Sequence, residues 1–305
     1  MESFFAGVGG FLLTVLAVFL VTELSLVLEE AILVRFELRK GFTGAKTGLI
    51  KVFQRHALKV LRIEGPPSKH FISAAKYLMV FFAAGCLPLW GGEPALNPPH
   101  SLWIFLGIIL LGPIAQLAIA WYFNKGAGWP VLLTTNERTI GSATVLFTLA
   151  IALVAMTGVD RFSDFIEAQA RHSWLVFRYP LSVLLAFAFA VVSLFVTFQS
   201  VFSRTGDARP AGWGMDDLIP QLSRAVWSLF IVDIFFGGAA GALSGPVGDA
   251  LFILKAVVIN VISGVVAKLF FQLREDQAEA FILWRLAPIS IAILALSLIF
   301  PGGLT

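Results

Sequence analysis

The chain has 305 residues, of which 58% are hydrophobic and only 13% are charged, and its mean hydropathy is +0.87. This composition is too apolar for a soluble globular domain and indicates a protein that crosses a membrane several times. The net charge is +3, and a single cysteine, Cys86, excludes an internal disulfide framework.

Eight apolar stretches follow one another along the chain. A helix needs about 20 apolar residues to cross the hydrocarbon core of a bilayer. We therefore expect an all-α fold, a polytopic transmembrane bundle of about eight helices that forms a single domain over residues 1–305. The expected spans are residues 5–34, 71–90, 101–123, 138–158, 179–202, 221–240, 247–271 and 278–300.

A basic loop, residues 35–70, follows the first span. Ten of the 22 basic residues lie between Arg35 and Lys76. With helical spacing, apolar residues such as Val52 and Val60 gather opposite the charges, which predicts an amphipathic helix that lies along the membrane face without crossing it. Because its flanks are apolar, we expect this loop to meet a cytoplasmic membrane surface and no nucleic acid. The charged side of the helix comprises Lys51, Arg55, Lys59 and Arg62.

Lysine and arginine in the connections predict the orientation. Cytoplasmic connections carry more of these residues than outer ones, so the 35–70 loop is placed inside and both termini outside. The connection at 159–178 argues the other way, because it is expected outside and has three arginines, although its length and its acidic residues weaken that argument.

Four ionisable side chains within the expected spans are candidates for an ion pathway. Glu23 and Glu30 are seven residues apart and share one face of the first span, whereas Glu29 points elsewhere and is expected near the interface. Asp233 and Lys255 lie in adjacent spans and predict a buried pair. Each charge costs about 2.5–3.5 kcal/mol on insertion scales, so it needs water, a partner or neutralisation. A structural ion pair explains Asp233 and Lys255 as well as a proton relay does.

The sequence has none of the common catalytic motifs. GxSxG, Walker, HExxH and strand-preceded GxGxxG patterns are absent, and no cluster of cysteine and histidine could hold zinc or iron–sulfur. We therefore expect this chain to have no catalytic centre of its own.

The first loop resembles a segment of a known family. Glu30 lies at the end of the first span, a basic glycine-rich loop follows at 39–48, and the amphipathic helix then contains Lys59 and Glu64. In this order the segment is similar to the first cytoplasmic loop of the H subunit of respiratory complex I, which has relatives in group 4 membrane-bound hydrogenases and formate hydrogenlyase. The glycines of the family's GPNRVG-type loop are kept and its proline is not.

Two further regions resemble the same family, the start of the fourth span and the C-terminal part. Residues 138–143 open the fourth span with an arginine. In the C-terminal part, 252–255 read FILK where the family has FLLK, and 273–277 read LREDQ where it has LRYDQ. The chain departs from the family at Ala143, where a glutamate is usual, and in the connection after the fifth span, which has few acidic residues. The resemblance therefore indicates a divergent member.

The resemblance implies a membrane subunit of a complex I-like or hydrogenase-like energy-converting assembly in a bacterial or archaeal cytoplasmic membrane. Such a subunit would contact lipids, dock a cytoplasmic redox module and join antiporter-like subunits, as part of an obligate hetero-oligomer. Iron–sulfur clusters or a nickel–iron centre would belong to partners, and quinone binding stays open. A structural anchor without ion conduction and a stand-alone secondary transporter are the alternatives. The expected docking residues are Arg39, Lys40, Lys46, Lys51, Arg55, Lys59, Arg62 and Arg274.

Overall fold

The structure is a computed structural model that describes residues 2–38, 67–89, 94–111, 129–171, 173–197, 218–238, 245–270, 277 and 280–300. Every regular element within these ranges is helical, which confirms the all-α part of the expected fold. The elements are α1 (Glu2–Leu38), α3 (Pro67–Gly85), a helix at Ser101–Leu111, α5 (Trp129–Thr157), α6 (Phe162–Arg171), α7 (Leu175–Arg178), α8 (Pro180–Thr197), α10 (Ile219–Phe235), α11 (Pro246–Phe270), the π-helical turn η2 (Ile282–Leu286) and α13 (Ala287–Ile299).

Four of the described helical segments are long and apolar enough to cross a membrane, by length and composition. Three more apolar helices are shorter, so the structure gives half of the eight expected spans by this criterion. The four segments are Val8–Glu29, Ile140–Thr157, Pro246–Ala267 and Ile282–Ile299, and the shorter helices are Ala74–Gly85, Ser101–Leu111 and Pro180–Val196.

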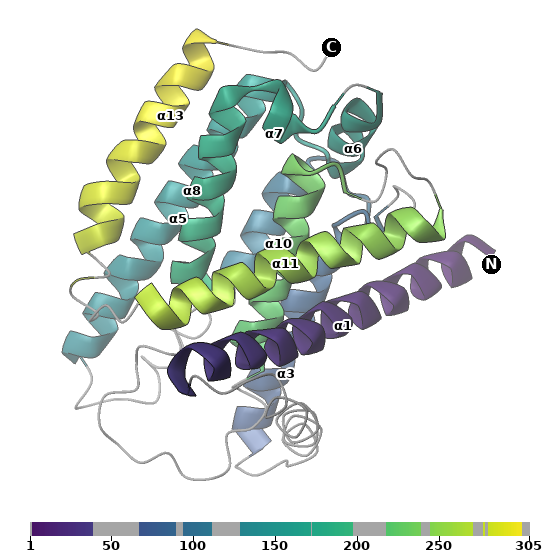
Figure 1. Ribbon diagram of the computed structural model, residues 1–305, viewed down its shortest axis with the longest axis horizontal. Coiled ribbons are helices and arrows are strands. Elements are labelled where there is room, and N and C mark those ends of the chain that lie inside the picture. Colours follow the sequence, from purple (N-terminus) through teal and green to yellow (C-terminus); the bar gives the residue numbers. More distant parts are fainter. Residues whose placement is uncertain are drawn as a thin grey trace.

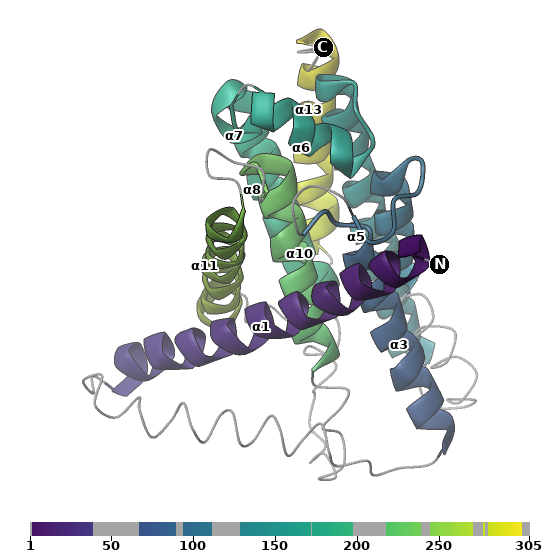
Figure 2. The ribbon, with the colours of Figure 1, turned by 90° about the vertical axis from the view of Figure 1, so that its right-hand side faces the viewer.

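Helix α10 lies at the centre of the molecule. It is buried around most of its circumference, and α1, α3, α6, α7, α8 and α11 all contact it. Helix α1 crosses α10 at a steep angle, whereas α3 and α8 run closer to the direction of α10 (Figure 2). Helix α13 packs on α5 and α8, on the other side of the molecule from α1 (Figure 1). The residues of α10 can therefore meet side chains from distant parts of the sequence.

An aromatic cluster fixes the surroundings of α10. The ring of Phe105 stacks on Phe230 with centroids 4.9 Å apart, and Phe162 and Trp227 meet Phe105 edge-on at 5.7 and 5.6 Å. All four side chains are buried. Such pairs contribute about 0.5–1.5 kcal/mol beyond the area they bury, so the cluster ties the 101–111 helix and α6 firmly to α10.

The outer surface of the bundle is apolar. On α1 every fourth residue from Leu12 to Leu28 is an exposed leucine, between 42% and 63% accessible. Exposed apolar patches of this extent are rare on soluble monomers and mark contact with lipid or protein. Together with the long apolar helices, this surface fits a membrane-embedded protein. Further exposed apolar residues lie on α11 and α13, among them Leu254, Val258, Ile262, Ile291 and Leu298.

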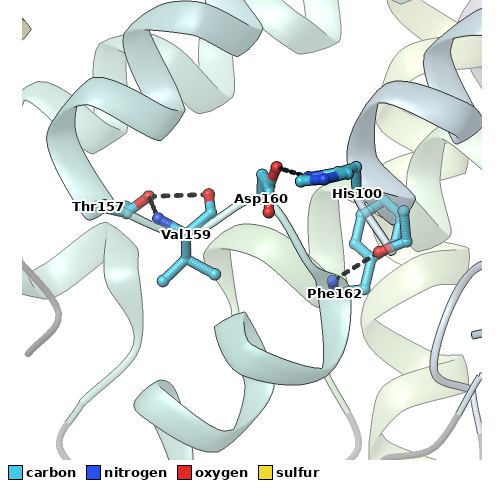
Figure 3. A network of polar contacts seen from close by, with 6 residues as sticks. His100, Thr157, Val159, Asp160 and Phe162 are labelled. Atoms are coloured by element: carbon cyan, nitrogen blue, oxygen red, sulfur yellow. Dashed lines mark hydrogen bonds and ion pairs between the residues drawn. The ribbon is translucent and has the colours of Figure 1, made fainter. Parts of the chain in front are cut away.

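A polar network joins two connections near the end of α5 (Figure 3). The ring Nδ1 of His100 lies 2.5 Å from Asp160 Oδ2, and the backbone N–H of Phe162 donates to Ser101 Oγ at 2.9 Å. The Thr157 hydroxyl donates to the Leu153 carbonyl at 2.7 Å and closes the last turn of α5. These contacts position the start of α6, which in turn covers one end of α10.

Candidate functional site

Three polar side chains from three helices meet inside the apolar bundle. Arg224 of α10 donates from Nη2 to Glu29 Oε2 of α1 at 2.7 Å, and from Nε to Asn260 Oδ1 of α11 at 2.9 Å. The side chains of Arg224 and Glu29 are 5% and 1% exposed, and Asn260 is fully buried. We call Glu29, Arg224 and Asn260 the Arg224 cluster. It holds two opposite charges where water cannot screen them.

A glycine makes room for the Arg224 cluster. A Cβ atom at Gly264 of α11 would collide with the Glu29 carboxylate and would lie 2.5 Å from Arg224 Nη1. The ion pair therefore lies directly against the backbone of α11. This close approach explains how the ion pair between α1 and α10 fits beside α11, which packs extensively on α1.

The Arg224 cluster gives Glu29 a partner that the sequence did not predict. The Glu29 side chain is buried inside the protein against Arg224, and its expected position near the membrane interface stays a prediction. Sequence analysis missed Arg224, because it lies near one end of an expected span and belongs to no motif. The sequence feature that could have identified it is a charged residue three positions inside the apolar stretch at 221–240.

Glu23 and Glu30 are placed only in part. Glu23 is half-buried on α1, and its Oε2 atom is buried without a hydrogen-bond partner in the portion of the chain that the structure describes. The side chain of Glu30 lies outside the described residues, so the shared face of the two glutamates stays a prediction.

The second buried charge lies toward the other end of α10. Asp233 is 1% exposed, and neither of its carboxylate oxygens has a hydrogen-bond partner among the described residues. The Lys255 ammonium of α11 donates to the carbonyls of Phe236 at 2.9 Å and Gly238 at 3.4 Å. It also lies 4.3 Å from the centroid of the Trp174 ring. We call Asp233, Lys255, Trp174 and these two carbonyls the Asp233 site.

Two glycines and a glutamine shape this end of α10. Gly237 and Gly238 have φ values of +76° and +51°, in the left-handed region that glycine adopts without strain. Gln169 of α6 donates from Nε2 to the carbonyls of Asp233 and Ile234 at 3.0 and 2.9 Å. The helix end is therefore closed by α6 on one side and by the Lys255 ammonium on the other.

The predicted pair of Asp233 and Lys255 is realised only in part. The two residues lie on adjoining helices, close enough for each charge to act on the other. The ammonium, however, binds the backbone carbonyls of the turn and not the carboxylate. The carbonyls at a helix C-terminus carry the negative end of the helix dipole, which makes them strong acceptors for a cation.

The other predicted site residues are not described. Arg39, Lys40, Lys46, Lys51, Arg55, Lys59, Arg62 and Arg274 lie outside the described residues. In the ranges that the structure does cover, no group of three or more histidine, cysteine, aspartate or glutamate side chains could hold a metal ion. No protein-family model matches the sequence.

Proposed function

We propose that this chain is an integral-membrane subunit of a complex I-like or membrane-bound-hydrogenase-like assembly. It docks the cytoplasmic redox module on its basic 35–70 loop and couples that module to ion-translocating membrane subunits. Electron transfer and its cofactors belong to the partner subunits. The observation that carries the proposal is the presence of buried charges on α1 and α10, which pack on each other and on α11; α11 contributes the buried Asn260 and the partly exposed Lys255.

Buried charges are a poor way to stabilise a membrane bundle. Replacing a buried ion pair by apolar residues of similar volume is often neutral or stabilising, and ionisable groups inside apolar spans are costly. A role in packing therefore explains these ionisable residues less well than a role in which they respond to changes of charge in the assembly. The residues are Glu29, Arg224, Asp233 and Lys255. Lys255 also ends the FILK segment, which resembles the FLLK segment of the H subunit.

Two helices that contribute to both charged sites support the proposed coupling between them. Helices α10 and α11 contribute to both, and Lys255 and Asn260, five positions apart on α11, are separated by about 7.5 Å along the helix axis. Glu29 connects the Arg224 cluster to α1, which leads directly into the basic loop. In the proposed function, a displacement of the docked module moves α1, and the two charged sites respond mechanically or electrostatically.

Reversing the charges of Lys51, Arg55 and Lys59 to glutamate should remove the redox module from the purified assembly. The reason is that like charges facing each other across an interface cost several kcal/mol. Subunit composition after purification in mild detergent, identified by mass spectrometry, measures the loss. Arg171→Glu is the control, because Arg171 is exposed on the connection expected to face the other side. Retention of the module by the triple variant would contradict docking on this loop.

A further inference from the structure

Among the residues that the structure describes, none donates a hydrogen bond to the Asp233 carboxylate. Both oxygens are buried, and no hydrogen-bond partner is found for either within the described ranges. A buried carboxylate without donors is unstable unless a proton, a water molecule or a cation accompanies it. The Lys255 ammonium is near, but its hydrogen bonds go to Phe236 and Gly238. The buried Asp233 oxygens can therefore accept a cation or a hydrogen-bond donor on their side of the turn.

Electron-rich groups converge on this turn. The carbonyls of Phe236 and Gly238 accept from Lys255, and the Trp174 ring presents its face to the same ammonium. Carbonyl oxygens at a helix C-terminus and aromatic faces both attract cations. The surroundings thus already hold one cation, the built-in ammonium of Lys255.

The carboxylate belongs to the same turn as the two carbonyls. A Cβ atom at Gly238 would lie 2.8 Å from Asp233 Oδ1, so the carboxylate rests against the glycine backbone. The left-handed φ of Gly238 folds the chain back toward Asp233. Three oxygen ligands are therefore offered within the six residues from 233 to 238.

We propose that the 233–238 turn binds a monovalent alkali cation of the sodium type, in exchange with the Lys255 ammonium. The ligands are the Asp233 carboxylate and the carbonyls of Phe236 and Gly238. Oxygen ligands suit hard cations, whereas transition metals prefer sites with nitrogen or sulfur. A single carboxylate beside a lysine favours one positive charge over two, because the excess charge would be buried.

Exchange requires that Lys255 can leave the turn. Its side chain is partly exposed, and a lysine can extend its four-carbon stem toward the surface while the stem keeps its apolar contacts. The incoming cation then takes the two carbonyls together with the carboxylate. Cation binding at the Asp233 site does not depend on whether a redox module docks elsewhere on the protein.

The test compares sodium chloride with choline chloride at equal ionic strength, using the full-length protein in detergent. Thermal unfolding and tryptophan fluorescence are followed as each salt is titrated. Sodium should stabilise the wild type and choline should not.

Lys255→Met removes the built-in competitor and should lower the half-saturating sodium concentration at least tenfold, which corresponds to about 1.4 kcal/mol. Asp233→Asn should abolish the difference between the salts, whereas Asp249→Asn, the same acid-to-amide change in the first turn of α11, should keep it.

Overlapping sodium and choline curves for the wild type and Lys255→Met would overturn the proposal, and so would a sodium effect that survives Asp233→Asn. If Asp233→Asn does not fold, Lys255→Arg is measured instead. This variant keeps a cation at position 255 and should need at least as much sodium as the wild type. Equal sodium affinities for Lys255→Arg and Lys255→Met would also overturn the proposal. None of these readouts involves a partner subunit, so their failure would leave the docking proposal to its own test.

Discussion

Replacing Arg224 with methionine should lower the free energy of unfolding by about 3–5 kcal/mol, because the substitution leaves the Glu29 carboxylate buried without its counter-charge. The two groups are 2.7 Å apart and 5% and 1% exposed. Asn260 would also lose the donor to its side-chain oxygen. Breaking a buried pair costs more than the pair contributes, since the remaining charge cannot return to water.

Denaturant unfolding of the full-length protein in detergent, followed by circular dichroism, measures this loss. The control is Arg171→Met, which removes an exposed ion pair with Glu167 and should cost less than about 1 kcal/mol. The double variant Glu29→Met and Arg224→Met should recover most of the stability, because it removes both charges at similar volume. If Arg224→Met cost no more than Arg171→Met, the buried pair would not hold α1 to α10.

Replacing Gly237 with alanine should destabilise the protein through two separate effects. The left-handed φ of +76° costs about 1–2 kcal/mol for a residue with a Cβ atom. The new Cβ would also lie 2.6 Å from Trp174 Cδ1, and such overpacking adds about 1–3 kcal/mol. Because Trp174 faces the Lys255 ammonium, its displacement should also disturb the Asp233 site.

Gly158 provides a matched control for the alanine substitution. Its φ is +75°, but a Cβ atom there would meet nothing within 4 Å. Gly158→Ala should therefore show the backbone strain alone, and the difference between the two variants measures the contact with Trp174. Thermal unfolding of both variants in the same detergent gives this difference. Equal losses at the two positions would mean that the ring does not press on the turn.

The long apolar helices could be predicted from the sequence. Expected spans at 5–34, 138–158 and 247–271 correspond to α1, α5 and α11, because an unbroken apolar run of this length has few other structures available to it. The placement of Asp233 and Lys255 on adjoining helices followed from the same runs. Local composition was sufficient to predict these helices and the placement of these two residues.

The contacts between helices could not be predicted in the same way. Glu29 and Arg224 are 195 residues apart, and their meeting depends on how steeply α1 crosses α10. No periodicity within either helix encodes that angle. The 159–178 segment was expected only as a connection, but it forms α6 and α7, and Gln169 closes the end of α10. Its short helices bury only one face, so they carry little hydropathy signal.

The central claim, that this chain works as one subunit of a redox-driven membrane assembly, is tested most directly by purifying the tagged full-length protein from native membranes in mild detergent. Mass spectrometry then identifies the proteins that remain bound. We predict a stoichiometric complex that contains antiporter-like membrane subunits and a peripheral subunit with iron–sulfur clusters or a nickel–iron centre. A chain that purifies without such a subunit, and that transports a solute by itself in liposomes, would contradict the account.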